Sequence, residues 1–295
     1  MTENKSLRIK PCALRIDFHT HIFPEKISAA VIDKLSRISR TPAFTDGTLS
    51  GLRKSMDAAQ MDLSVILPVA TNTSQVEKIN SSAAKLNEEF ADAGIFSLGC
   101  IHPDFTNYRE ELRRVKNRGL KGIKIHPVYQ DTNLDDVKFL RIFDRAAELD
   151  LIVVAHAGLD IGFPGVVKCS PQMARHVVDE VGDFKFVLAH MGGWKNWSDV
   201  LKLLTDTKVF IDTAFSTGEI IPRSDCRWEA DELKLLDASQ FMTFVKIFGA
   251  DRILFGTDSP WSSQKKSLDF INALPLADAD KVKILGLNAK RLLEL

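Results

Sequence analysis

The chain has 295 residues and 45% hydrophobic composition, which is enough for one large domain with a full core. It carries 39 Lys and Arg and 39 Asp and Glu, so its formal net charge is zero. No basic stripe and no run of about 18 apolar residues occurs, so we expect neither a nucleic-acid partner nor a membrane span.

Eight apolar runs follow one another along the chain, with room for a helix between most neighbours. Most runs are continuous rather than alternating, as expected for strands that are buried on both faces of a parallel sheet. The runs cover residues 14–21, 63–70, 95–102, 120–126, 151–156, 184–190, 209–213 and 252–258.

The segments between the runs predict amphipathic helices. Val76, Ile79, Ala83, Leu86 and Phe90 form one apolar stripe, and residues 137–147 and 282–292 repeat the pattern. The alternation of strand and helix predicts a single α/β domain over residues 1–295, a (β/α)8 TIM barrel. A doubly wound open sheet is the alternative, but it would need a Gly-rich phosphate turn after an early strand, and none is present.

Two connections are long, and both leave the carboxyl end of a predicted strand. They are residues 22–62 and 214–251, and loops at that end of a barrel shape the substrate pocket. Four cysteines, Cys12, Cys100, Cys169 and Cys226, are far apart and form no Cys-x-x-Cys pair. With an N-terminus that lacks a secretory signal, this favours reduced thiols in a cytoplasmic protein and excludes a zinc ribbon.

Ionisable residues occur where the predicted strands end. His19 and His21 are two apart in a strand, so they point to the same face. His156, His190 and Asp258 close the fifth, sixth and eighth runs, and the carboxyl ends of barrel strands converge on one spot. Three histidines and a carboxylate suit zinc or another divalent first-row ion with a free position for water.

Each of these residues has an ordinary structural explanation when it is taken alone. A single His-x-His is weak evidence, His156 could be a satisfied core histidine, and Asp258 before Ser259-Pro260 could be a helix cap. The pattern as a whole is more specific than any member, because packing does not explain ionisable groups at several convergent strand ends.

The chain resembles the amidohydrolase superfamily, in particular the branch that includes aminocarboxymuconate-semialdehyde decarboxylase and the resorcylate-type decarboxylases. The resemblance covers nearly the whole chain. It rests on the segments Asp17-Phe18-His19-Thr20-His21-Ile22-Phe23-Pro24, Gly122-Ile123-Lys124-Ile125-His126-Pro127, His156-Ala157-Gly158, His190-Met191-Gly192-Gly193, Ile253-Leu254-Phe255-Gly256-Thr257-Asp258 and Asn288-Ala289-Lys290-Arg291-Leu292-Leu293.

The resemblance implies that His19, His21, His156 and Asp258 bind one divalent metal. Zinc is the most frequent ion in such proteins, and manganese or another first-row ion is also accepted. It further implies that His190 acts as the base or the orienter for a metal-bound water. Asp258 is a second catalytic candidate, because in some members that aspartate also accepts a proton.

The fourth run carries Lys124, which shares parity with His126. Binuclear members of the superfamily place a carboxylated lysine on this strand, so Lys124 is a candidate second-metal bridge, although the other motifs resemble the mononuclear branch. His126 is then a candidate substrate contact, as are Trp194, Arg223 and Trp261 on the loops.

Three functions follow, and we expect the first. A metal-dependent hydrolase would attack an ester, lactone or amide carbonyl of a small molecule with metal-bound hydroxide. A nonoxidative decarboxylase of a small carboxylated or aromatic acid would use the same ligands, and a non-catalytic metal-binding barrel is the alternative of another class. The resemblance also makes a homodimer plausible.

Overall fold

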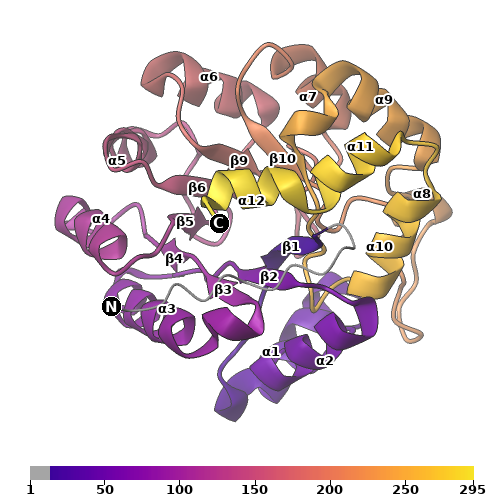
Figure 1. Cartoon of the computed structure of the whole chain (residues 1–295), viewed down its shortest axis with the longest axis horizontal. Helices are drawn as coiled ribbons and strands as arrows, with labels where there is room; N and C mark the ends of the chain where they lie inside the picture. The colour runs from indigo at the N-terminus through magenta and orange to yellow at the C-terminus, as the bar shows by residue number, and fades with distance from the viewer. Residues whose placement is uncertain (1–13) are drawn as a thin grey trace, which may run out of the picture.

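The computed structural model describes residues 14–295, so Cys12 lies outside the described residues. Its parallel strands form a ring at the centre of the molecule (Figure 1). They are β1 (Ile16–Thr20), β2 (Leu63–Ile66), β3 (Ile95–Ser97), β4 (Gly99–Cys100), β5 (Gly122–Ile125), β6 (Ile152–Ala155), β9 (Phe186–Leu188), β10 (Phe210–Asp212) and β11 (Ile253–Leu254). Each of the eight predicted runs contains one of these strands, and the third run contains both β3 and β4.

The ring closes through two connections outside the regular ladders. β3 and β4 are two parts of one strand that is interrupted at Leu98, and they join the ladder β1-β2-β3 to the ladder β4-β5-β6-β9-β10-β11. At the other seam, the Phe18 N–H donates to the Phe255 carbonyl (2.8 Å) and the Asp258 N–H donates to the His19 carbonyl (2.8 Å). The chain is therefore a closed parallel barrel, which confirms the predicted (β/α)8 fold.

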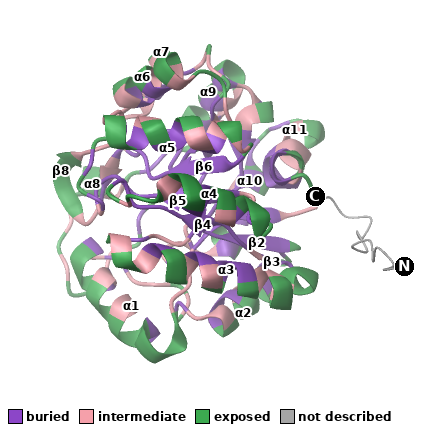
Figure 2. Cartoon of the chain, turned by 90° about the vertical axis from the view of Figure 1, so that its left-hand side faces the viewer, coloured by how far each residue is buried: buried purple, intermediate pink, exposed green. Residues whose placement is uncertain are grey.

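Helices surround the ring, and Figure 2 shows their exposed outer sides around the buried strands. The predicted stripes fall on α3 (Val76–Phe90), α5 (Val137–Glu148) and the C-terminal segment of α11 (Asp278–Val282), a π-helical turn (Lys283–Leu287) and α12 (Asn288–Leu293). The others are α1 (Glu25–Ser39), α2 (Leu49–Ala59), α4 (Tyr108–Asn117), α6 (Pro171–Val181), α7 (Trp197–Leu203), α8 (Ala230–Leu233), α9 (Ala238–Phe248) and α10 (Gln264–Ala273). No helix among the described residues is long and apolar enough to cross a membrane.

Helix α12 covers the amino-terminal end of the barrel. Its Leu292 and Leu293 are buried together with Ile16 and Leu63, the first residues of β1 and β2. Glu294 pairs with Lys185, just before β9 (2.5 Å). The opposite end, where the strands finish, is therefore the end available for a functional site.

The predicted elements do not include a short hairpin that follows β6. β7 (Leu159–Asp160) and β8 (Phe163–Val167) form an antiparallel hairpin after β6. Most of β8 is exposed, and it contains Pro164 and Gly165, which are rare in strands, so neither a buried run nor an alternating pattern marks it.

The two long loops meet over the carboxyl end of the barrel. The first carries α1 and α2, and the second carries α8 and α9. The Arg223 N–H donates to the Arg40 carbonyl (3.0 Å), and the Arg40 guanidinium lies 4.0 Å from the centre of the Trp228 ring. These contacts join the two loops to each other.

Candidate metal centre

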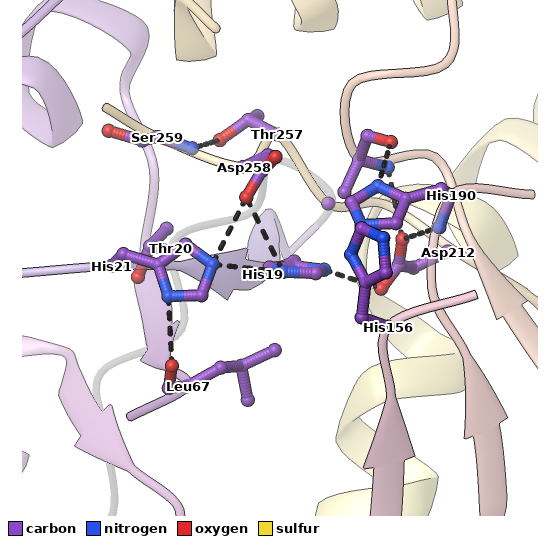
Figure 3. A network of polar contacts seen from close by, with 12 residues as sticks. His19, Thr20, His21, Leu67, His156, His190, Asp212, Thr257, Asp258 and Ser259 are labelled. Carbon is purple, nitrogen blue, oxygen red and sulfur yellow. Dashed lines mark hydrogen bonds and ion pairs between the residues drawn. The ribbon is translucent and has the colours of Figure 1, made fainter. Parts of the chain in front are cut away.

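His19, His21 and Asp258 converge at the end of β1 and beyond β11 (Figure 3). The His19 and His21 Nε2 atoms are 3.2 Å apart. Asp258 Oδ1 lies 3.1 Å from His21 Nε2 and 3.5 Å from His19 Nε2. We call these three residues the triad.

Hydrogen bonds on the far side of each ring fix the two tautomers. His21 Nδ1 lies 2.8 Å from the Leu67 carbonyl, so it carries the proton and donates. His19 Nδ1 likewise donates to Asp212 Oδ2 at 2.8 Å. Both Nε2 atoms therefore present lone pairs to the centre of the triad, beside a carboxylate oxygen.

Three acceptor atoms this close together repel one another unless a cation lies between them. Nitrogen ligands about 2.1 Å from one tetrahedral zinc ion are about 3.4 Å apart, which is close to the separations in the triad. The triad thus has the donor set and the spacing of a divalent-metal site.

Burial and charge support this role. Burial, with a further contribution from the nearby Lys124, holds the pKa of His19 well below its usual value, so the ring is neutral and can act as a ligand. Burial also opposes ionisation of Asp258, but the adjoining His21 and His19 outweigh it and leave the pKa of Asp258 below its usual value. At neutral pH the triad therefore holds an ionised Asp258 and a neutral His19 ring.

Asp212 at the end of β10 orients the site and was not among the predicted site residues. Its side chain is fully buried and accepts hydrogen bonds from His19 Nδ1 and from the His190 backbone N–H (2.9 Å). Asp17 lies on β1 two residues before His19, so its side chain points to the same face and it is another candidate to orient a ligand histidine. Its carboxyl group instead accepts from Thr257 Oγ1 (2.6 Å) and Gln264 Nε2 (2.7 Å). Burial raises the pKa of Asp17 to about 7.

Replacing Asp212 with asparagine is expected to weaken metal binding about 10- to 100-fold, because partners of this kind fix the orientation and basicity of a ligand histidine. Titration calorimetry with Mn²⁺ would measure the change. Asp17→Asn is the matched control: it alters a buried carboxyl group that touches neither imidazole, so it should lower stability and keep the affinity. Equal losses of affinity in both variants would contradict the role given to Asp212.

His190 lies beside the triad with one ring nitrogen committed to the backbone. Its Nδ1 donates to the Ala214 carbonyl (2.9 Å), so Nε2 carries the lone pair. The His190 ring lies 5.3 Å from the His19 ring, centre to centre. Nε2 meets His156 Nδ1 at 2.9 Å.

His156 does not join the triad in the described part of the chain, contrary to the expected ligand set. Its Nε2 points instead toward the Leu159 carbonyl (3.3 Å) and Asp160 Oδ2 (3.7 Å). The His156 ring stacks on His126 at 4.1 Å, and His126 Nε2 lies 3.4 Å from Asp160 Oδ2. His126, His156 and Asp160 thus form a second polar group, and Asp160 on β7 was not predicted.

Lys124 is buried and reaches the triad from β5. Its Nζ lies 3.4 Å from His19 Nε2. Burial lowers the pKa of Lys124 to about 8. Lys124 therefore lies beside the triad, and its role as a second-metal bridge stays a prediction.

The three loop residues predicted as substrate contacts have structural partners. The Trp194 indole N–H donates to the Phe215 carbonyl (3.0 Å). The Arg223 guanidinium makes two bonds of 2.8 Å to Asp225. The Trp261 backbone N–H donates to the Asp258 backbone carbonyl (2.8 Å), so of the three residues only Trp261 contacts a residue of the triad directly.

Comparison with known proteins agrees with the resemblance. The sequence model of the amidohydrolase family matches residues 16–295. A gamma-resorcylate decarboxylase from Rhizobium sp. (strain MTP-10005) is 51% identical over 134 residues, which are 42% of this chain and 38% of that protein. The match therefore spans less than half of the length of the relative.

Two solved structures share the fold. A 2,6-dihydroxybenzoate decarboxylase complexed with 2,6-dihydroxybenzoate aligns with a TM-score of 0.66 and 18% identity, covering 96% of this chain and 99% of that one. A dihydroxybenzoic acid decarboxylase from Polaromonas sp. JS666, with bound manganese and the inhibitor 2-nitroresorcinol, aligns with a TM-score of 0.65 and 16% identity, covering 96% and 97%.

These comparisons correct the expected reaction. The relative and both structural neighbours are decarboxylases, so the preference for a hydrolase was wrong, and the alternative reaction is the better supported one. Zinc gains no support either, since the metal in the Polaromonas structure is manganese. The family match over residues 16–295 nevertheless shows that the chain is an enzyme of the amidohydrolase family.

Proposed function

We propose that this protein is a metal-dependent nonoxidative decarboxylase of a hydroxylated aromatic acid. The observation that carries the proposal is the triad, whose two histidine lone pairs and one carboxylate converge on a single point. The segment that is 51% identical to a gamma-resorcylate decarboxylase supports decarboxylation among the reactions that such a site can perform.

We propose that His19, His21 and Asp258 hold the ion and that His156 remains the candidate for a fourth ligand. An ion held there would act as a Lewis acid on the oxygens of the substrate and stabilise the negative charge that develops on them. Manganese is the first ion to test, and zinc stays a prediction. One domain and a homodimer also stay predictions.

The reaction replaces a carboxylate with a proton. The bond between the ring carbon and the carboxylate carbon breaks, its electron pair stays on the ring carbon, and that carbon takes a proton as CO₂ leaves. His190 is the proposed proton carrier, because the Ala214 carbonyl holds Nδ1 and leaves Nε2 as the exchanging atom. His156 Nδ1 meets that atom at 2.9 Å and could supply it with a proton.

The experiment is incubation of the Mn²⁺-loaded protein with 2,6-dihydroxybenzoate and other hydroxybenzoates, with CO₂ and the phenolic product measured together. We expect equal amounts of both, and none after the metal is removed by a chelator. Absence of CO₂ release from every acid tested, with the metal shown to be bound, would refute the proposal and favour a non-catalytic metal-binding barrel.

A further inference from the structure

Lys124 is a basic side chain beside the triad, and the proposed reaction assigns it no role. It is 1% exposed, and its Nζ lies 3.4 Å from His19 Nε2. Among residues 14–295, no carboxylate oxygen lies within 4.0 Å of that Nζ. A buried amine whose polar contact among these residues is a histidine nitrogen at 3.4 Å is poorly satisfied, so its position needs another explanation.

The carboxylates near Lys124 are already engaged. Asp212 accepts from His19 Nδ1 and the His190 backbone, and Asp258 belongs to the triad. Both act on Lys124 only at longer range. The anion that would pair with Nζ at close range must therefore come from a ligand.

The two arginines that join the loops, Arg223 and Arg40, are occupied as well. The Arg223 guanidinium donates two hydrogen bonds to the Asp225 carboxylate. Arg40 lies over the Trp228 ring and 3.7 Å from Glu232. In contrast, Lys124 reaches the same His19 nitrogen that faces the triad, so an anionic group bound at the triad lies within its reach.

We propose that Lys124 Nζ binds the carboxylate group of the substrate and makes the site select aromatic acids over the corresponding phenols. The inference rests on the proposed function for the identity of the ligand. It requires a free amine that donates hydrogen bonds to the substrate, which distinguishes it from a carboxylated lysine that bridges two metals.

The test compares binding of 2,6-dihydroxybenzoate and of resorcinol, the same ring without the carboxylate. Titration calorimetry would use Mn²⁺-loaded protein that carries His190→Asn to suppress turnover. Lys124→Met should weaken binding of the acid about 10- to 100-fold, the usual strength of a charge-assisted hydrogen bond, and leave resorcinol within about twofold. Lys121→Met is the matched control, because this partly exposed lysine lies before β5 at the other end of the barrel.

Further variants keep the test decisive. Lys124→Arg should recover part of the affinity for the acid, and Lys124→Gln replaces Lys124→Met should the latter not fold. Equal weakening of acid and resorcinol would overturn the inference. So would a metal content that falls from two ions to one in Lys124→Met, which would make Lys124 a metal bridge.

The outcomes separate this inference from the proposed reaction. Lys124-dependent binding of the acid without CO₂ release by the unaltered protein would keep the carboxylate site and refute decarboxylation. CO₂ release together with an acid preference that survives Lys124→Met would support decarboxylation and refute the carboxylate site at Lys124.

Discussion

Replacing Asp258 with asparagine is expected to strip the metal from the protein. Asp258 Oδ1 is the one anionic ligand atom of the triad. The asparagine side chain has the same shape but presents either a neutral oxygen or an N–H group that repels a cation. Asparagine also tolerates the left-handed backbone at this position (φ 66°), so the fold should persist. We expect metal affinity to fall more than about 100-fold, beyond the usual loss for an outer partner.

Plasma mass spectrometry after gel filtration would measure the metal, and kcat would be measured on the same sample. Asp225→Asn is the control, since this exposed carboxylate on the second long loop pairs with Arg223. Retention of a full complement of metal with loss of turnover would instead make Asp258 the proton acceptor. His156→Asn in the same experiment decides whether His156 is a fourth ligand.

The barrel was predictable because its strands are buried on both faces. Continuous apolar runs such as 151–156 mark such strands, whichever residues follow them. The ends of the strands were less predictable. His190 and Asp258 close apolar runs, yet both have positive φ values, of 59° and 66°, and lie beyond the last residues of β9 and β11. Periodicity does not report the angle at which a chain leaves a strand.

The convergence of His19 and His21 followed from the alternation of side chains along β1. The position of Asp258 followed from the meeting of strand ends in a barrel. Asp212 carried a comparable signal, a carboxylate closing the apolar segment Val209-Phe210-Ile211, and it was available to the same argument.

Other features of the site depend on loop geometry that no local pattern encodes. Asp160 reaches His126 only because the β7–β8 hairpin folds back over the end of β6. The direction of the His156 ring depends on its stack with His126 and its contact with His190, which come from different strands. These contacts join segments far apart in the chain and require the tertiary structure.

Replacing His190 with asparagine is expected to lower kcat about 100- to 10,000-fold and to leave the metal in place. The new amide can still donate to the Ala214 carbonyl from the position of Nδ1, and asparagine tolerates the left-handed backbone of residue 190. What disappears is Nε2, the ring atom proposed to deliver a proton to the substrate carbon. The loss should therefore fall on turnover rather than on folding.

Steady-state kinetics and metal analysis of the same preparation would measure both effects. His176→Asn is the matched control, because this histidine lies on α6 with a half-exposed side chain. His190→Gln is a second variant, since its amide approaches the position of Nε2 but does not exchange a proton near neutral pH. Loss of metal from His190→Asn but not from His176→Asn would make His190 a ligand. Unchanged turnover in both His190 variants would assign the proton to another group, with the His156 ring as the nearest candidate.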